Sequence, residues 1–163
     1  MHIWDFLGLQ PSHVVELASL KKRQIVSAPG VYVLLGPEGT PYRYPRGASP
    51  VFYIGESSTL ADRIDRHRLR TSTVQRGKAS GIEWPRYEYA AAHGCLVAAF
   101  PSLATTSKEC RFIQDEVIAL FAKFYGAPPI ADASANRGRV LRRNPPLPPQ
   151  GLTCRPWVLA PDA

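Results

Sequence analysis

Two short apolar runs along the chain are each bounded by turn residues. The first is Gly30–Leu35 (GVYVLL), which follows the turn-forming segment Ser27–Pro29, and the second is Val51–Ile54 (VFYI), which ends at Gly55. β-Branched and aromatic residues dominate both runs, a composition typical of buried strands. We therefore predict two strands that pair antiparallel.

A helix is predicted directly after the second strand. The Ser57–Thr59 cluster offers several N-cap residues, and Leu60 and Ile64 mark the apolar side of the helix. Arg63 and His67 are four residues apart on a face that overlaps this side. Because arginine is rarely placed beside a buried surface for packing alone, both residues are candidates for a functional role.

A second helix is predicted near residue 106. Thr106 and Glu109 form a capping box, TSKE. Glu116 follows Ile113 by three residues and precedes Leu120 by four, so we expect its carboxylate to point toward the apolar side. An inward carboxylate is costly unless it is paired or bound to a cation. Apolar residues recur at helical spacing throughout this segment: Ile113, Val117, Leu120, Phe121 and Phe124.

Two further segments complete the predicted architecture. Met1–Gln24 predicts a helix that opens at Pro11–Ser12 and ends in the basic residues Lys21–Arg23. Glu83–Phe100 predicts a third strand or a hairpin, with a turn at His93–Gly94. The predicted fold class is α+β, with a small, three-stranded, mostly antiparallel sheet flanked by helices.

The segment between the first two strands, Gly36–Pro50, is long and rich in glycine and proline. Tyr42, Arg43, Tyr44 and Arg46 alternate aromatic and basic side chains, which suits base stacking and phosphate contact. A solvated hairpin extension explains the segment equally well.

Composition favours one globular domain. The chain has 163 residues, of which 45% are hydrophobic and 20% charged. Lys and Arg exceed Asp and Glu by 20 to 13, which gives a net charge of +7, as expected for a protein that meets polyanions, although many basic proteins bind none. Cys95, Cys110 and Cys154 show no CxxC spacing, which argues against a disulfide framework and a structural zinc site. With no long apolar run and no signal-like N-terminus, we expect a cytoplasmic location.

A basic cluster continues from the first predicted helix. We expect it either to follow a DNA backbone or to form a solvated surface. The cluster consists of Arg66, Arg68, Arg70, Arg76 and Lys78.

The tripeptides GVY and YIG, with Arg63 eight residues after Gly55 and His67 four residues later, resemble the GIY-YIG nuclease family. The resemblance extends from Pro29 to Asn136. It implies that Glu116, on the later helix, holds a single Mg²⁺ or Mn²⁺ ion.

The resemblance also implies roles for the other residues of the motif. Arg63 would bind a non-bridging phosphate oxygen, while Tyr32 with His67 or Tyr53 would position or deprotonate the attacking water. The family asparagine corresponds to Asn136, which stands farther beyond the glutamate than is typical. Asp132 is an acceptable substitute in that place. The segment between the two strands is also longer than the connection typical of the family.

This reading divides the chain into an N-terminal helical extension at 1–28, a nuclease domain at 29–136 and a basic, proline-rich arm at 137–163. The predicted function is a metal-dependent endonuclease acting on duplex or branched DNA, in repair, restriction or a mobile element. The alternative is a nucleic-acid-binding module that keeps the fold and has lost cleavage. An interaction domain without a nucleic-acid partner ranks last, because it would leave the basic charge unused. The nucleic-acid-binding candidates are Arg43, Arg46, Arg66, Arg68, Arg70, Arg76, Lys78 and Asn136.

Overall fold

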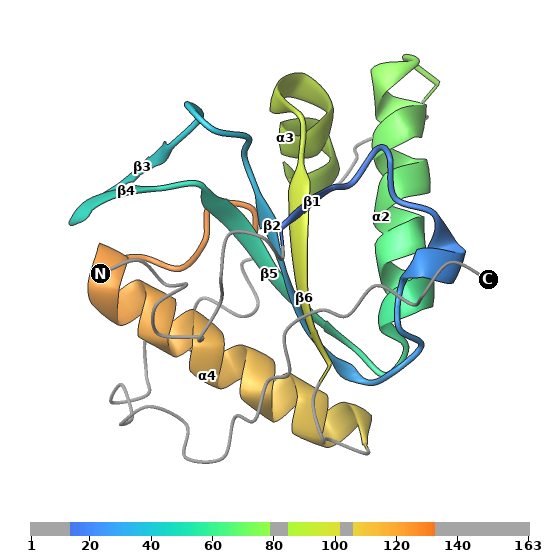
Figure 1. Cartoon of the computed structure of the whole chain (residues 1–163). Coiled ribbons are helices and arrows are strands. Elements are labelled where there is room, and N and C mark those ends of the chain that lie inside the picture. Colours follow the sequence, from blue (N-terminus) through green and yellow to red (C-terminus); the bar gives the residue numbers. More distant parts are fainter. Residues whose placement is uncertain (1–13, 79–84, 102–105, 133–163) are drawn as a thin grey trace.

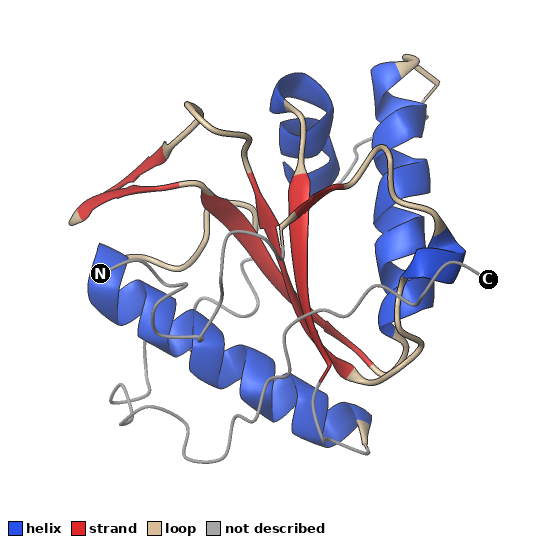
Figure 2. Cartoon of the chain, in the orientation of Figure 1, coloured by secondary structure: helices blue, strands red, loops and turns tan. Residues whose placement is uncertain are grey.

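The computed structural model describes residues 14–78, 85–101 and 106–132. These residues form an α+β fold in which a four-stranded antiparallel sheet, in the order β1-β6-β2-β5, combines with a two-stranded sheet, β3-β4, and three helices (Figures 1 and 2). A short 3-10 turn, η2 (Lys22–Gln24), precedes β2. The strands are β1 (Val15–Glu16), β2 (Gly30–Leu35), β3 (Tyr42–Tyr44), β4 (Gly47–Ser49), β5 (Val51–Ser57) and β6 (Leu96–Pro101). The helices are α2 (Leu60–Gln75), α3 (Pro85–His93) and α4 (Ser107–Tyr125).

Strand β2 lies in the middle of the large sheet and is buried along its whole length. It pairs antiparallel with β5 on one side, as predicted, and with β6 on the other. Tyr32 lies opposite Gly55, and Leu34 lies opposite Tyr53. Because opposed residues of neighbouring strands point to the same face, Tyr32 and Tyr53 share one face of the sheet.

Helices cover both sides of this sheet. Helices α2 and α3 pack against each other on the side that carries Tyr32, and α4 lies along β5 on the other side (Figure 1). Leu60 and Ile64 attach α2 through buried side chains. Gln114 attaches α4, because its Nε2 donates a 2.9 Å hydrogen bond to the carbonyl of Ile54.

The capping box predicted for α4 is confirmed. The Thr106 hydroxyl accepts a hydrogen bond from the backbone N–H of Glu109, and the Glu109 carboxylate accepts one from the backbone N–H of Thr106. Gly126 ends the helix with φ of 79°, in the left-handed region that favours glycine. None of the helices in the described ranges is long and apolar enough to cross a membrane.

The helix predicted for Met1–Gln24 is wrong over its described part, residues 14–24. That part holds β1 and η2, and β1 adds a fourth strand to the three that the sequence predicted. Val15 pairs with Val97, and the Leu17 N–H donates to the carbonyl of Cys95. Val14 and Val15 are β-branched and suit the edge of a sheet, so pairing with a distant strand prevails over local helical spacing.

The strand or hairpin predicted for Glu83–Phe100 is partly wrong. Helix α3 occupies residues 85–93, and only the later part, β6, is a strand. Pro85 stands at the first helical position, where its missing N–H costs nothing. Tyr87 and Ala90 are buried at a spacing of three, and Gly94, with φ of 79°, follows the end of the helix.

The segment Gly36–Pro50 folds as the β3–β4 hairpin, which was the structural alternative. Tyr42 and Tyr44 are buried, whereas Arg43 is exposed. The Tyr44 hydroxyl donates a 2.6 Å hydrogen bond to the Val51 carbonyl. These two tyrosines therefore stabilise the hairpin, and their rings are not open for stacking on bases.

Of the three cysteines, Cys95 and Cys110 are free and buried. Burial raises the pKa of the Cys95 thiol to about 12. Cys154 lies outside the described residues, as do Asn136 and the basic arm.

Candidate active site

A chain of hydrogen bonds joins three of the residues marked by the family resemblance. Arg63 Nε donates a 3.1 Å hydrogen bond to the Tyr32 hydroxyl oxygen, which lies 2.7 Å from His67 Nε2. Since the oxygen accepts from Arg63, its own hydrogen is available to donate to His67 Nε2. A hydroxyl oxygen can also accept a second hydrogen bond, so the direction between Tyr32 and His67 depends on the histidine tautomer. We take Tyr32 as the donor, which places the His67 proton on Nδ1, an atom with no hydrogen-bond partner among the described residues. The direction of donation is then Arg63 to Tyr32 to His67.

Tyr32 and His67 are both removed from solvent, with exposed fractions of 0% and 1%. Burial raises the pKa of Tyr32 well above its ordinary value. Burial also lowers the pKa of His67 well below its ordinary value, and the positive charges of Arg63, Arg86 and Arg66 add to this effect. Both side chains are therefore neutral near pH 7.

Arg63 supplies a fixed positive charge beside this neutral pair. Its burial acts to lower its pKa, but the hydroxyl groups of Tyr32 and Tyr53 outweigh burial and raise the pKa above its ordinary value. The guanidinium is half-buried, with one side on the tyrosines and another on a surface pocket. Arg63 thus connects the buried tyrosine and histidine to the surface.

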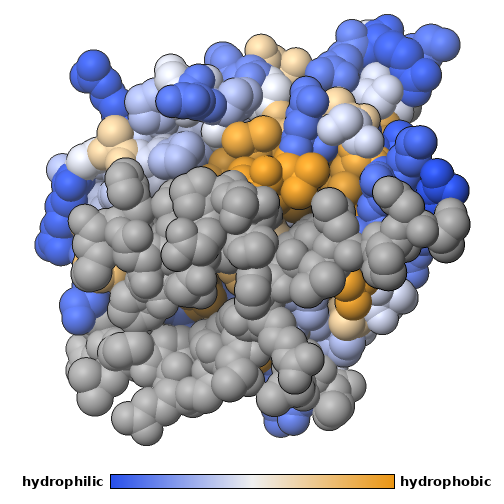
Figure 3. All heavy atoms as spheres, viewed as in Figure 1, coloured by the Kyte–Doolittle hydropathy of each residue, from blue (hydrophilic) through white to orange (hydrophobic). Residues whose placement is uncertain are grey.

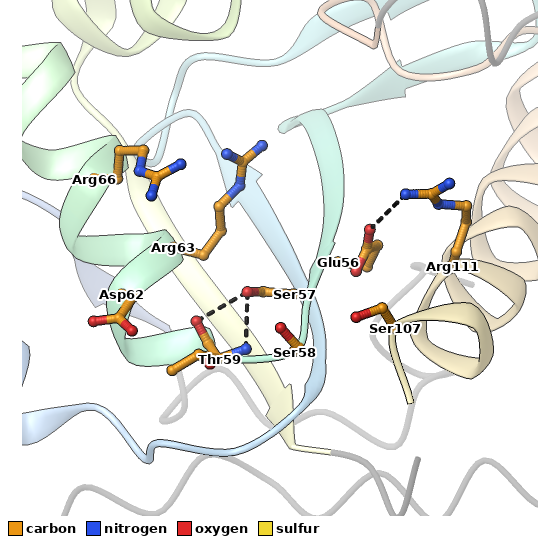
Figure 4. A pocket seen from close by; sticks show the side chains of 9 residues that line it. All are labelled: Glu56, Ser57, Ser58, Thr59, Asp62, Arg63, Arg66, Ser107 and Arg111. Carbon is orange, nitrogen blue, oxygen red and sulfur yellow. Dashed lines mark hydrogen bonds and ion pairs between the residues drawn. The ribbon is translucent and has the colours of Figure 1, made fainter. Parts of the chain in front are cut away.

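The pocket beside Arg63 has a volume of about 470 Å³. In Figure 4, Arg63 and Arg66 extend from α2 on one side and Arg111 from α4 on the other. We call it the arginine pocket. It is lined by Glu56, Ser57, Ser58, Thr59, Asp62, Arg63, Arg66, Ser107 and Arg111.

The charge of the arginine pocket favours an anion. Three arginines and two carboxylates line it, so three positive minus two negative charges leave a net charge of +1. The N-terminal ends of α2 and α4 both border it, and helix N-termini carry partial positive charge. Four serine and threonine hydroxyls add hydrogen-bond donors.

The two carboxylates of the pocket already have cationic partners. Glu56 lies 3.8 Å from the guanidinium of Arg111 (Figure 4). Asp62 forms a 2.6 Å ion pair with Lys22, and both side chains are more than half exposed. The excess positive charge therefore lies with Arg63 and Arg66.

The structure brings Tyr32, Tyr53, Arg63 and His67 close together, and Arg63 is the one of the four that lines the arginine pocket. The ring centroids of Tyr32 and Tyr53 are 6.0 Å apart, and those of Tyr53 and His67 are 5.7 Å apart. These four residues come from β2, β5 and α2, the elements that the sequence identified best.

The predicted role of Glu116 as a metal ligand stays a prediction. Glu116 is buried, with 7% exposed, but it is not among the described residues that line the arginine pocket. Gln114 contacts the sheet. Glu116 is two residues further along the helix, a rotation of about 200°, so the two side chains leave α4 on different sides. The α4 residues that face the pocket are Ser107 and Arg111. Asp132, the substitute for the family asparagine, is buried on the chain that follows α4.

The predicted basic cluster is spread along α2 and beyond its C-terminal end, and Arg68 lies on a different side from Arg66. Arg66 lines the arginine pocket, whereas Arg68 is paired with Asp65 at 2.8 Å on another side of α2. Arg70, Arg76 and Lys78 are exposed toward the C-terminal end of the helix.

The two arginines of the hairpin lie far from α2. Arg43 and Arg46 are exposed, and Arg46 donates a 3.1 Å hydrogen bond to the carbonyl of Lys123. In Figure 3, hydrophilic residues cover the hairpin tip on one side of the molecule and the end of α2 on the other. The hairpin arginines and the α2 arginines are therefore separate basic surfaces.

Sequence reasoning missed two groups of residues near the site. Glu56 directly follows YIG, and the continuation of β5 into the pocket was not predicted. Arg86 and Tyr87 lie on α3, where a strand was expected, so nothing pointed to their position beside Tyr53 and His67. The proline at 85 was the one local signal of a helix start.

No protein-family model, curated protein or solved structure matches this chain. Within the described residues, no group of three or more His, Cys, Asp or Glu side chains is placed to hold a metal ion.

Proposed function

We propose that the protein is a DNA endonuclease of the GIY-YIG type, which hydrolyses a phosphodiester bound in the arginine pocket. The observation that carries the proposal is the hydrogen-bonded chain from Arg63 through Tyr32 to His67, with Arg63 also lining a basic pocket. The GVY and YIG tripeptides and the spacing to Arg63 and His67 support the same assignment.

The pocket suits the phosphate group of a nucleic acid. Arg63 would hold a non-bridging oxygen of the scissile phosphate, and its fixed orientation against Tyr32 suits charge stabilisation in the transition state. Arg66 would neutralise a neighbouring phosphate. The serine and threonine hydroxyls at the N-terminal ends of α2 and α4 would donate to the remaining oxygens.

The buried pair would handle the proton of the attacking water. Tyr32 is fully buried in the free protein and does not line the arginine pocket, so this step requires that the attacking water enter beside Arg63 when DNA binds. Water would then lose a proton to the Tyr32 hydroxyl oxygen while Tyr32 passes its own proton to His67 Nε2. Two O–H bonds break, one on water and one on Tyr32, while a new O–H bond forms on Tyr32 and an N–H bond forms on His67. The negative charge ends on the attacking hydroxide and the positive charge on His67, and Arg63 would stabilise the Tyr32 oxygen while the two protons move. Because this step needs neutral His67, burial and the surrounding arginines keep the base ready near pH 7.

The resemblance implies a single Mg²⁺ or Mn²⁺ ion, and we propose that cleavage requires one. Glu116 is not among the described residues that line the pocket, to which α4 presents Ser107 and Arg111, so its role as a ligand stays a proposal. The carboxylates that share the pocket with Arg63 are Glu56 and Asp62, and Asp62 is paired with Lys22. Comparing Glu56→Gln with Glu116→Gln separates the two assignments, because the variant that removes a ligand should lose cleavage by at least about a hundredfold.

The second candidate is a nucleic-acid-binding module without cleavage. Arg111 favours it, because α4 presents a cation to the pocket where the resemblance implies a carboxylate. Such a pocket would still bind phosphate.

The deciding experiment incubates the full chain with branched, nicked, single-stranded and duplex DNA, with Mg²⁺, with Mn²⁺ and with EDTA. An endonuclease cuts at least one substrate with metal and none with EDTA, and Arg63→Ala abolishes cutting with some loss of binding. If the wild-type protein binds DNA and cuts none of these substrates, the binding module is correct.

A further inference from the structure

A second arginine lies against the aromatic residues of the candidate site. Arg86 is on α3, only 8% exposed, and its guanidinium carbon lies 4.9 Å from the ring centroid of Tyr53 and 5.1 Å from that of Tyr87. Both distances are within the range of a cation–π interaction, which strengthens when the groups are removed from water. Arg86 is thus held by two rings, one of which belongs to the YIG tripeptide.

The same two rings surround His67. The centroid of Tyr87 lies 5.3 Å from the imidazole centroid, and that of Tyr53 lies 5.7 Å from it. Arg86 therefore approaches His67 from the side of α3, across the rings that contact it. On the other side, Tyr32 from β2 makes the hydrogen bond to Nε2.

Within the described part of the chain, the charged groups that act on His67 are three arginines. Arg63 and Arg66 come from its own helix and Arg86 from α3, and each opposes a positive charge on the imidazole. The titratable groups packed against it from the other elements are the hydroxyls of Tyr32 on β2, Tyr53 on β5 and Tyr87 on α3. Arg86 is the cation of this set that lies outside the arginine pocket and is held instead by Tyr53 and Tyr87.

We propose that Arg86 is a positioning residue of the candidate site: it holds the rings of Tyr53 and Tyr87 around His67 and, as a cation, opposes protonation of the imidazole. The catalytic part of this proposal rests on the proposed nuclease function, whereas the effect on His67 does not. Arg86 touches no reacting atom in this account and acts through Tyr53 and His67.

The effect on His67 is measured by NMR titration of the imidazole in the full chain, without DNA. Arg86→Gln removes the charge, so the midpoint of His67 should rise by about half a pH unit or more. Arg86→Lys keeps the charge and should stay close to the wild-type midpoint. Arg23→Gln is the matched control, because Arg23 is an exposed arginine on η2. His67→Gln identifies the signal.

If Arg86→Gln shows no more protonation of His67 than the wild type at any pH at which both are folded, the proposal is overturned. Should Arg86→Gln fail to fold, Arg86→Met supplies a second uncharged side chain of similar length, and the same comparison applies.

The catalytic part is tested by the pH profile of DNA cleavage. Cleavage needs neutral His67, so the acid limb of kcat/KM should move to higher pH in Arg86→Gln and stay in place in Arg86→Lys. Arg86→Lys should lower kcat with little change in KM, because the ammonium lacks the flat surface that holds Tyr53. An acid limb that does not move in Arg86→Gln overturns this part. If the wild type cuts no DNA, the nuclease proposal fails, and the NMR titration still decides the role of Arg86.

Discussion

The ring of Tyr32 occupies the space that a side chain at Gly55 would need. A Cβ added to Gly55 would overlap the Tyr32 ring and hydroxyl. The two residues face each other across β2 and β5, so the glycine of YIG is required by the tyrosine of GVY. The two tripeptides of the motif are therefore one packing unit, and the position of Tyr32 beside Arg63 and His67 depends on it.

Gly55→Ala should destabilise the protein by about 1–3 kcal/mol, because the added methyl group displaces a fully buried ring. Urea denaturation measures the change. In a Tyr32→Leu background the same substitution should cost much less, since the ring that it meets is gone. Equal costs in the two backgrounds would show that the overlap with Tyr32 is not the cause.

Tyr32→Phe should destabilise the protein by about 1–3 kcal/mol, because it leaves Arg63 Nε and His67 Nε2 without the oxygen that joins them. Tyr42→Phe is the matched control. The Tyr42 hydroxyl is buried and has no hydrogen-bond partner among the described residues, so its removal should be neutral or stabilising. Chemical denaturation of the two variants should rank them in this order, and the reverse order would refute the hydrogen-bonded chain.

The elements that the sequence predicted are those specified by neighbouring residues. Strands β2 and β5 are short runs of β-branched and aromatic residues, and α4 begins with a capping box. Helix α2 follows from the four-residue spacing of Leu60 and Ile64. Each signal lies within a few positions of the element that it forms, so the sequence alone was sufficient.

The missed elements depend on distant partners. Strand β1 has two residues and exists through pairing with β6, which is far away in the sequence. In α3, Tyr87 and Tyr89 alternate as in a strand, and their helical arrangement is stabilised by packing on α2 and β5. The same limit applies to the site. Tyr32, Tyr53, Arg63 and His67 lie on predicted elements, whereas Arg86 depends on α3 and the orientation of Glu116 depends on how α4 meets the sheet.

The stability of the protein should fall as the pH drops below about 6.5, the ordinary pKa of histidine in the unfolded chain. Folded His67 has a lowered pKa, so the unfolded state binds more protons between the two values. The contribution of neutral His67 to the free energy of unfolding is complete above pH about 6.5. As the pH falls, this contribution is lost at up to about 1.36 kcal/mol per pH unit, until the pKa of folded His67 is reached. Thermal or urea unfolding across this range should show a shallower pH dependence in His67→Gln. An identical dependence would mean that His67 is protonated while folded.

Arg66 and Arg68 should affect DNA binding differently. Arg66 lines the arginine pocket, so Arg66→Ala should weaken association and lower the slope of log K against log salt by about one. Arg68 is paired with Asp65, so Arg68→Ala should leave the slope nearly unchanged. Fluorescence anisotropy at several salt concentrations gives both slopes. A larger effect at Arg68 would place the DNA on another side of α2.

The most direct test of the account is the single-turnover cleavage rate of Tyr32→Phe against Tyr42→Phe, at saturating DNA and with Mg²⁺ or Mn²⁺. Both substitutions remove one buried tyrosine hydroxyl, but only the first interrupts the chain from Arg63 to His67 among the described contacts. We predict that Tyr32→Phe cuts at least about a hundredfold more slowly than wild type, a loss of roughly 2.7 kcal/mol in transition-state stabilisation, while Tyr42→Phe cuts at the wild-type rate. Equal rates in the two variants, or a wild-type protein that binds DNA and cuts none, would contradict the proposal that the chain from Arg63 through Tyr32 to His67 supports DNA cleavage.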